Sequence, residues 1–283
     1  MVRSSEVARD LPSFDVRPLL PAERQELVTW LSGLPPDGWA APTVNVGWSV
    51  HDTALHLLGN DVGRLDPRSA ADSTDEGTSF LALAARIERS NEQWVDATRR
   101  IPTALLVELL SFIQPRVDAA FAAVDLESPG VPVAWTGNGP TPYWLDIARE
   151  YAERWVHHAQ MRLAVGQRPL VDRRWLFPVV DAFMRCLPRA YEPVEAPAGS
   201  TITVEVSGDA GGAWHVVRGR KRWHLRLSAT APDATVGIAA DAAWRLLSRS
   251  GDMEAVLSSI VIDGDRELGR AAARAVAIMT TRL

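Results

Sequence analysis

The chain has 283 residues, of which 47% are hydrophobic, and its formal net charge is −5. This length and hydrophobic content are enough for two domains with cores of their own. The acidic balance argues against a dedicated nucleic-acid binder, because neutralising phosphates takes clustered positive charge. The one cysteine, Cys186, excludes an internal disulfide framework. Neither a signal peptide nor an apolar run of about 18 residues is recognisable. We therefore expect a soluble, cytoplasmic protein that binds neither nucleic acid nor a membrane.

Residues 1–170 show amphipathic patterns separated by helix caps and breakers. Pro35-Pro36 would end the first helix, Ser49 can cap the second, and a Gly- and Pro-rich loop precedes the last. Long helices with short connections predict an up-and-down four-helix bundle. The predicted helices are Pro21–Leu34, Val50–Arg64, Thr78–Arg100, Thr103–Val124 and Pro142–Val165.

The pattern changes after residue 170. Residues 171–192 are predicted to form a connector, with a helix over Arg174–Tyr191, and a Pro/Ala/Gly-rich stretch then leads into a small α+β domain over 193–283. In that domain apolar residues recur at every second position, which is typical of strands. The predicted strands are Ile202–Val206, Trp214–Arg218, Trp223–Ser228 and Ser259–Ile262. The predicted helices are one capped by Asp241 that runs to Arg249, and Arg266–Thr280.

Three side chains form a candidate metal site. Glu153 and His157 are four residues apart, so on a helix they share one face, about 6 Å apart. His56 lies on a second amphipathic helix of the same bundle. Two imidazoles and one carboxylate are a ligand set of catalytic zinc sites, which leave a further position open for water or substrate. Taken singly, His56 is more typical of a core or surface histidine, and Glu153 with His157 could equally be a surface pair.

Two other histidines bear on whether this site is open. His158 lies about 100° around the helix from His157, which places it beside the site or at the surface. His51 precedes His56 by five residues, a poor spacing for sharing a face. If either supplied a fourth ligand, the site would be closed, and a non-catalytic, metal-stabilised protein that binds an apolar ligand would be favoured.

Further side chains could line the cavity at the metal. Asn60 shares a helix face with His56, Gln160 follows His157 by three residues, and Trp48 flanks the first ligand helix. We predict a catalytic role for Asn60 and contacts to a bound cosubstrate for Trp48 and Gln160. Ordinary hydrogen bonds between helices are the alternative for both amides.

In the C-terminal domain, Arg245 follows Trp244 and could hold a substrate carboxylate, in catalysis or in cosubstrate binding. The alternative is a solvent-facing arginine beside a core tryptophan. Cys186 is interpreted as a small core residue. A basic run is interpreted as a solvated hairpin tip; it comprises Arg218, Arg220, Lys221 and Arg222.

The same residues resemble the DinB-like metalloprotein superfamily and, within it, the mycothiol-dependent maleylpyruvate isomerases. The segment GWSVHDTALHL, Gly47–Leu57, resembles the family's first motif, and REYAERWVHH, Arg149–His158, resembles its second. The resemblance implies zinc ligands at His56, Glu153 and His157. The C-terminal hairpin with DAAWRLL and IVIDGDREL resembles the family's sterol-carrier-like domain, so the likeness covers nearly the whole chain. One departure is Gln160, where family members usually have aspartate.

The resemblance implies an enzyme with one divalent metal ion per chain, zinc, and mycothiol as thiol cosubstrate. A metal-coordinated thiol loses its proton and could attack a small electrophilic molecule. If the adduct is kept, the enzyme is an S-transferase; if the thiol leaves after bond rotation, it is a cis–trans isomerase. We predict the transferase, because Gln160 departs from the isomerase pattern. The arginine-rich, lysine-poor composition fits an actinobacterial source, and a monomer or homodimer is expected.

Overall fold

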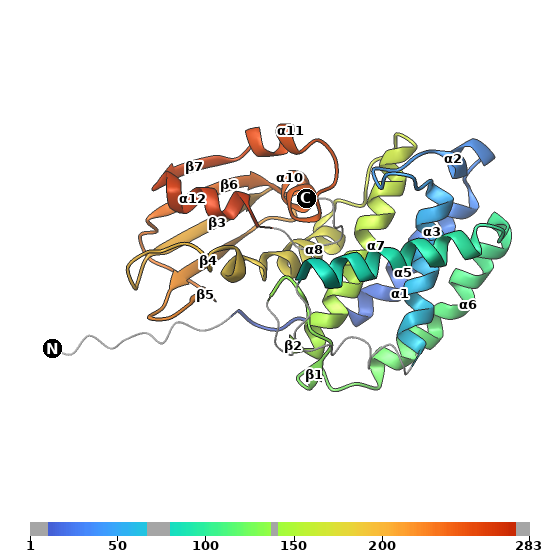
Figure 1. Ribbon diagram of the computed structural model, residues 1–283, viewed down its shortest axis with the longest axis horizontal. Coiled ribbons are helices and arrows are strands. Elements are labelled where there is room, and N and C mark those ends of the chain that lie inside the picture. Colours follow the sequence, from blue (N-terminus) through green and yellow to red (C-terminus); the bar gives the residue numbers. More distant parts are fainter. Residues whose placement is uncertain (1–10, 67–79, 137–140, 276–283) are drawn as a thin grey trace. The chain divides into compact units, whose positions relative to one another are not determined.

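A computed structural model describes residues 11–66, 80–136 and 141–275 (Figure 1). The chain divides into two compact units. The N-terminal unit consists mainly of Asp15–Ala134 and Asn138–Val171, and the C-terminal unit mainly of Asp172–Ala277. Trp135 and Phe14 also belong to the C-terminal unit. None of the helices in the described ranges is long and apolar enough to cross a membrane.

The N-terminal unit is helical, as predicted. Its helices are α1 (Leu20–Ser32), α2 (Pro36–Ala40), α3 (Val50–Leu65), α5 (Phe80–Thr98), α6 (Thr103–Ala122) and α7 (Tyr143–Ala164), with a 3-10 turn η1 (Arg17–Leu19) before α1. A short antiparallel ladder of β1 (Pro129–Gly130) and β2 (Thr141–Pro142) precedes α7.

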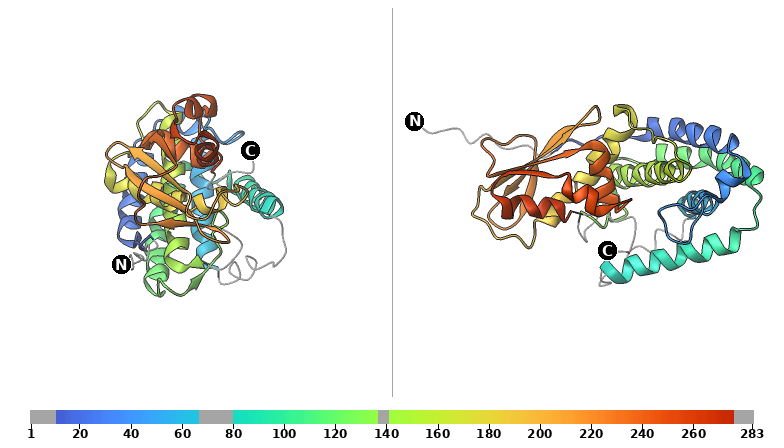
Figure 2. Two further views of the ribbon diagram at one scale, coloured as in Figure 1. Left: turned by 90° about the vertical axis from the view of Figure 1, so that its left-hand side faces the viewer. Right: turned by 90° about the horizontal axis from the view of Figure 1, so that it is seen from above.

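Helix α3 lies at the centre of this unit, in contact with α5, α6 and α7, and α1 packs against α6 and α7. Figure 2 shows α5 at the outside of the helices, where it contacts α3. Leu55 and Leu57 of α3 and Tyr151 of α7 are fully buried at these contacts. Helices α3 and α7, which carry the predicted metal ligands, are therefore direct neighbours.

The predicted helix ends of this unit fall within a few residues of the observed ones. Ser49 caps α3 as expected, and Pro102 directly precedes α6. Helix α5 is described from Phe80, so the predicted start at Thr78 lies outside the described residues.

The C-terminal unit combines one five-stranded sheet with several helices. Its strands, in the order β5-β4-β3-β6-β7, pair antiparallel except for the parallel pair β3 and β6. The strands are β3 (Thr201–Ser207), β4 (Gly212–Arg218), β5 (Trp223–Arg226), β6 (Ala234–Ala239) and β7 (Val261–Gly264). The helices are α8 (Arg173–Met184), α9 (Leu187–Ala190), α10 (Ala240–Ser248), α11 (Met253–Ser258) and α12 (Arg266–Ala273). Helices α10 and α12 pack on β3 and β6 (Figure 1).

The predicted connector proves to be part of the C-terminal unit, because residues from Asp172 onward cluster with it. Its single predicted helix is also wrong. Helix α8 ends at Met184 and α9 begins at Leu187, because Pro188 offers no N–H to the Met184 carbonyl and its ring would clash with that group.

Other differences in this unit have local causes. Strand β6 and helix α11 were not predicted, although Ala234, Val236 and Ile238 alternate as a half-buried strand should. Asp241 is not the cap of α10: the helix begins one residue earlier, and the Asp241 carboxylate accepts a hydrogen bond from Trp244 Nε1. Helix α12 ends at Ala273, and the predicted continuation to Thr280 extends beyond the described residues.

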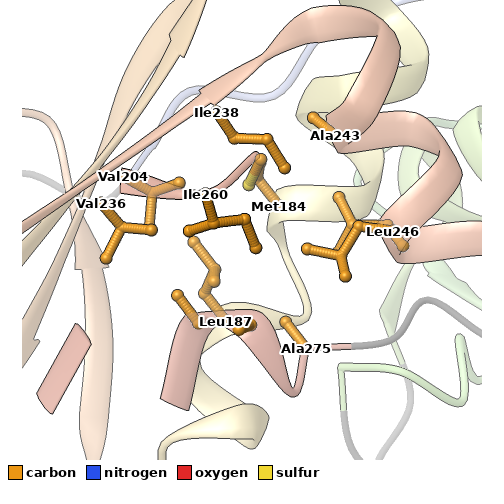
Figure 3. A pocket seen from close by; sticks show the side chains of 12 residues that line it. Met184, Leu187, Val204, Val236, Ile238, Ala243, Leu246, Ile260 and Ala275 are labelled. Atoms are coloured by element: carbon orange, nitrogen blue, oxygen red, sulfur yellow. The ribbon is translucent and has the colours of Figure 1, made fainter. Parts of the chain in front are cut away.

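A small apolar cavity lies between the sheet and its helices. Figure 3 shows it lined by aliphatic side chains and a methionine, among them Met184, Leu187, Val204, Val236, Ile238 and Leu246. Its volume is about 20 Å³, which is room for about one water molecule. The interior of this unit is thus a nearly filled hydrocarbon core.

Candidate metal centre

The local sequence fixes where each ligand-bearing helix begins. The Ser49 hydroxyl accepts a hydrogen bond from the Asp52 N–H, and the Asp52 carboxylate accepts one from the Ser49 N–H. This reciprocal capping box starts α3 and places His56 two turns into the helix. Glu153 and His157 lie one turn apart on α7. The predicted spacing on one helix face is therefore present.

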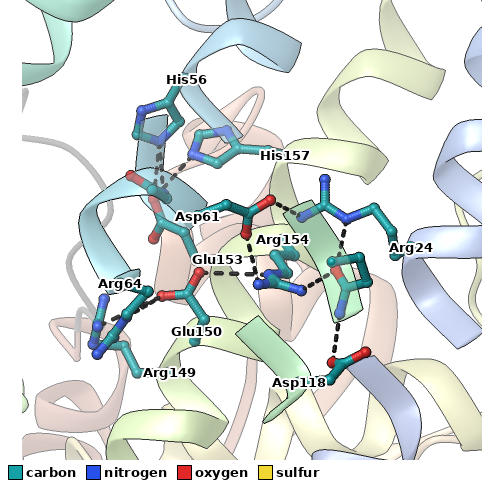
Figure 4. A network of polar contacts seen from close by, with 12 residues as sticks. Arg24, His56, Asp61, Arg64, Asp118, Arg149, Glu150, Glu153, Arg154 and His157 are labelled. Carbon is teal, nitrogen blue, oxygen red and sulfur yellow. Dashed lines mark hydrogen bonds and ion pairs between the residues drawn. The ribbon is translucent and has the colours of Figure 1, made fainter. Parts of the chain in front are cut away.

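The structure brings the three predicted ligands together. Nε2 of His56 and Nε2 of His157 each lie 3.2 Å from Oε1 of Glu153, and one donor atom from each residue lies within 4.8 Å of the others. Figure 4 shows the three side chains converging between α3 and α7. Ligands held about 2.1 Å from a tetrahedral zinc ion are roughly 3.4 Å apart. The distances from the two imidazole nitrogens to the carboxylate oxygen are close to this value.

Charge and burial favour the ligand form of these groups. Burial alone would raise the pKa of Glu153, but hydrogen bonds from His157 and His56 outweigh it and lower that pKa to about 2. Burial lowers the pKa of His56, so its imidazole favours the neutral state. The carboxylate is therefore ionised, and a metal bound between these atoms would replace the two hydrogen bonds to Glu153. The Glu153 side chain is 14% exposed against 4% for His56, so the carboxylate is the more accessible of the two although both are largely buried.

Gln160 orients His157. Its Oε1 lies 2.8 Å from His157 Nδ1 and 2.8 Å from Asn45 Nδ2. An amide oxygen can only accept, so Gln160 keeps a proton on His157 Nδ1. A metal would then bind at Nε2, in place of the contact of that nitrogen with Glu153. A carboxylate often does this work beside metal-bound histidines; here a neutral amide supported by Asn45 provides the acceptor.

A tight turn before α3 positions Asn45 against Gln160 and Trp48 against His56. The Trp48 N–H donates to the Asn45 carbonyl, and Gly47 between them has φ +85°, a conformation that glycine adopts without strain. One end of the turn supplies Asn45 to Gln160, and at the other the Trp48 ring packs on His56 with centroids 5.2 Å apart. The turn thus supports both histidine ligands.

Asn60 lies at the centre, as predicted. Its Nδ2 is 3.3 Å from His56 Nε2, the same nitrogen that faces Glu153. The Asn60 amide and the Glu153 carboxylate therefore both lie within hydrogen-bonding distance of the nitrogen that would bind a metal.

Neither of the other two histidines joins this cluster. His51 Nε2 lies 2.9 Å from the Ile101 carbonyl. His158 is buried, bonded to Glu23 through Nδ1 and to Arg162 through Nε2, so the interpretation that it lies at the surface is wrong. Among the described residues the metal-ligand group contains three side chains, those of His56, Glu153 and His157.

The remaining predicted residues lie in the C-terminal unit. Arg245 on α10 pairs with Asp241 at 2.9 Å, and its guanidinium stacks 4.8 Å from the Trp244 ring centroid; its role toward the metal centre stays a prediction. Cys186 is buried as predicted. The hairpin residues Arg220, Lys221 and Arg222 are exposed, in keeping with a solvated tip.

Sequence reasoning missed a buried set of charged residues that continues from the metal ligands along α3 and α7 (Figure 4). It also missed Asn45. Charged residues usually mark the exposed face of a helix, which is why their pattern was not interpreted as interior. Their proximity in sequence to the ligands was an available signal: Asp61 follows Asn60, and Arg154 follows Glu153.

Comparison with known proteins agrees with this centre. The sequence model of the mycothiol maleylpyruvate isomerase N-terminal domain matches residues 20–162, half of the chain, which includes all three candidate ligands. The chain belongs to this family of enzymes.

Two solved structures have a similar fold. One is the crystal structure of the mycothiol-dependent maleylpyruvate isomerase, and the other is that of a histidine-to-alanine mutant of the same enzyme. Each has a TM-score of 0.52 and 11% sequence identity, with 87% of this chain and 91% of that chain covered. No curated protein sequence matches the chain. The shared fold therefore extends over both units, beyond the segment that the family model matches.

Proposed function

We propose that this chain is a metal-dependent, mycothiol-using cis–trans isomerase of the maleylpyruvate type. The observation that carries the proposal is the cluster of His56, Glu153 and His157 on two neighbouring helices, inside the segment that matches the family model. The similar crystal structures bear the name of that enzyme. The substrate class would be a small unsaturated acid with an electrophilic cis double bond.

Two nitrogens and one carboxylate oxygen suit zinc, and a zinc ion held there would keep the sulfur of a bound thiol deprotonated. A thiol that adds to one carbon of a double bond and later leaves permits rotation about that bond without being consumed. The chain supplies no such sulfur itself, because burial raises the pKa of the Cys186 thiol to about 12. An external thiol is therefore the fitting nucleophile.

The chain's own residues would orient the reacting groups. Gln160 keeps the Nδ1 proton on His157, and Trp48 covers one side of His56. When the lone pair of His56 Nε2 is engaged by a metal, the Asn60 amide loses that acceptor and is free to donate to an oxygen of the substrate. The Glu153 side chain is the most accessible of the three, at 14% exposed, so thiol and substrate would approach from its side.

The S-transferase prediction is not confirmed, and the isomerase fits the family better. Transfer was preferred because Gln160 departs from the family's usual aspartate. Gln160 nevertheless accepts the hydrogen bond from His157 Nδ1, so the exchange keeps the orienting contact and gives no reason to prefer transfer. The apolar cavity behind the sheet of the C-terminal unit, at about 20 Å³, is too small for an apolar ligand and so lends no support to the alternative of an apolar-ligand carrier.

A metal-reconstitution experiment tests the proposal. Metal-free and zinc-loaded protein are each mixed with mycothiol and maleylpyruvate, and proton NMR follows the vinyl coupling constant and the free thiol. We expect the cis isomer to become the trans isomer only with both zinc and mycothiol, with the thiol unconsumed. Stoichiometric loss of thiol into a stable adduct would instead establish transfer. Turnover without zinc, or without mycothiol, would refute the mechanism.

A second measurement isolates thiol binding. Calorimetry in two buffers of different ionisation enthalpy should detect binding of mycothiol to the zinc-loaded protein together with release of a proton. Equal affinity of the metal-free protein for mycothiol would contradict the role given to the metal.

A further inference from the structure

Helices α3 and α7 are cross-linked by buried ion pairs beside the metal ligands. Arg64 of α3 donates from Nη1 and Nη2 to the two oxygens of Asp146, both at 2.8 Å, and from Nε to Glu150 at 3.0 Å. Arg154 of α7 donates to Asp61 of α3 at 2.7 Å. As residue numbers rise along α3 they fall along α7, so the two helices run antiparallel at these contacts.

Two further helices join the cross-link. Arg24 of α1 donates to the second oxygen of Asp61 at 2.7 Å, and the Gln114 amide oxygen of α6 accepts from both Arg24 and Arg154. Asp61 and Arg154 are completely or almost completely buried. The Arg24–Asp61–Arg154 triad therefore joins three helices in the interior, directly beyond the ligands (Figure 4).

These contacts constrain sliding in a way that apolar packing does not. Hydrocarbon burial is non-directional, whereas a guanidinium fork matches carboxylates in one geometry. Arg64 spans Asp146 and Glu150, which lie about one turn, roughly 5.4 Å, apart on α7. A slip of α3 along α7 by one helical turn would break all three of these hydrogen bonds of Arg64 and leave buried charges unpaired.

The same slip would dismantle the metal centre. His56 precedes Asp61 by five residues on α3, and Glu153 directly precedes Arg154 on α7. Donor atoms 3.2 Å apart tolerate displacements of a few tenths of an ångström if they are to share one ion.

We propose that Arg64 and Arg154 are positioning residues: their buried ion pairs set the register of α3 against α7 and so hold His56 opposite Glu153 and His157. The inference rests on the proposed metal-dependent function. If the charged network maintains the geometry of the metal centre, substitutions in it should change metal affinity without a matching change in stability.

Three variants and a control test this separation, with Co²⁺ as the probe. Arg64→Lys and Arg154→Lys keep the charge but lose the fork. The triple variant Arg24→Met, Asp61→Leu, Arg154→Met replaces the triad by apolar side chains, an exchange that often leaves stability unchanged or raised. In this variant Gln114 keeps the Nε2 bond to Asp118, but its Oε1 loses both guanidinium donors, so urea unfolding is measured before the metal titration. The control is Arg149→Met, which removes ion pairs to Asp146 and Glu150 within α7 but no cross-link between helices.

For each protein, circular dichroism and urea unfolding report folding, and titration with Co²⁺ reports the dissociation constant and the visible spectrum of the bound ion. We expect folded variants whose Co²⁺ dissociation constants rise tenfold or more and whose spectra change, while Arg149→Met behaves as wild type. Wild-type affinity and spectrum in the folded variants would overturn the positioning role alone. Failure of the wild-type protein to bind Co²⁺ would instead overturn the proposed function, and this inference with it.

Discussion

The interiors of the two units differ in the side chains they bury. Behind the sheet of the C-terminal unit, the cavity is lined by aliphatic residues and a methionine (Figure 3). Between α3 and α7 of the N-terminal unit, arginines, carboxylates and histidines meet in a bonded network (Figure 4). An apolar interior stabilises a fold without directing it, whereas buried charges persist only with partners in fixed geometry. The contrast predicts that substitutions between α3 and α7 change metal binding, whereas substitutions at the cavity of the C-terminal unit change stability alone.

The largest effect should follow from removing the ligands. The double variant His56→Ala, His157→Ala should reduce bound metal from about one ion per chain to nearly none, because Glu153 alone cannot hold it, and should abolish turnover. Helix content should remain, since Leu55, Leu57 and other apolar residues form a separate core. Inductively coupled plasma mass spectrometry measures the metal. His51→Ala, outside the cluster, is the control, and full metal retention in the double variant would refute the site.

The apolar core should respond in the opposite way. Leu247 is 1% exposed and lines the cavity. We expect Leu247→Ala to lower the free energy of unfolding by about 2–5 kcal/mol and to leave metal affinity unchanged. Leu257→Ala, at a side chain 43% exposed, should change stability by at most about 0.5 kcal/mol. Urea unfolding and metal titration check both. A loss of metal affinity in Leu247→Ala would break the division of roles between the units.

Gln160 tests whether hydrogen bonds around the metal ligands matter. Gln160→Ala removes the acceptor at His157 Nδ1 and should weaken metal binding about 10–100-fold, at nearly unchanged helix content. Gln160→Glu keeps an acceptor and should bind metal at least as tightly as wild type. Competition with a chromophoric chelator measures the affinities. Identical affinity in the alanine variant would mean that the Asn45 and Gln160 pair contributes packing alone.

The smallest effect is expected from the C-terminal unit's candidate, Arg245. If it holds an anionic group of the thiol or substrate, Arg245→Ala should raise KM or lower turnover by about tenfold, or about 1.4 kcal/mol, with metal content unchanged. Arg270→Ala, at an exposed side chain that pairs with Glu267, is the control. Steady-state kinetics on both variants decide the matter: wild-type behaviour of Arg245→Ala would leave Arg245 as a partner of Asp241 only.

Local patterns predicted the helices better than the strands. The long helices of the N-terminal unit repeat an apolar face over several turns, and Ser49 and Pro102 mark two of the starts, so each can be inferred without its neighbours. Strand β6 has only six residues and is stabilised by pairing with β3 and β7. Pairing partners are set by the tertiary fold, which is why that strand escaped prediction.

The amino-acid pattern was enough to predict the part of the metal centre that lies within one helix. Glu153 and His157 must share a face because the α-helix repeats every 3.6 residues, and the family motifs pointed to His56 as their partner. The residues around these three side chains follow from how the helices pack against one another. The bonds of Asp61 with Arg24 and Arg154, of Gln160 with Asn45 and of His158 with Glu23 join residues 37 to 135 positions apart. Such contacts depend on how the helices pack, and a charged side chain on an isolated helix carries no sign of whether water or another charge will face it.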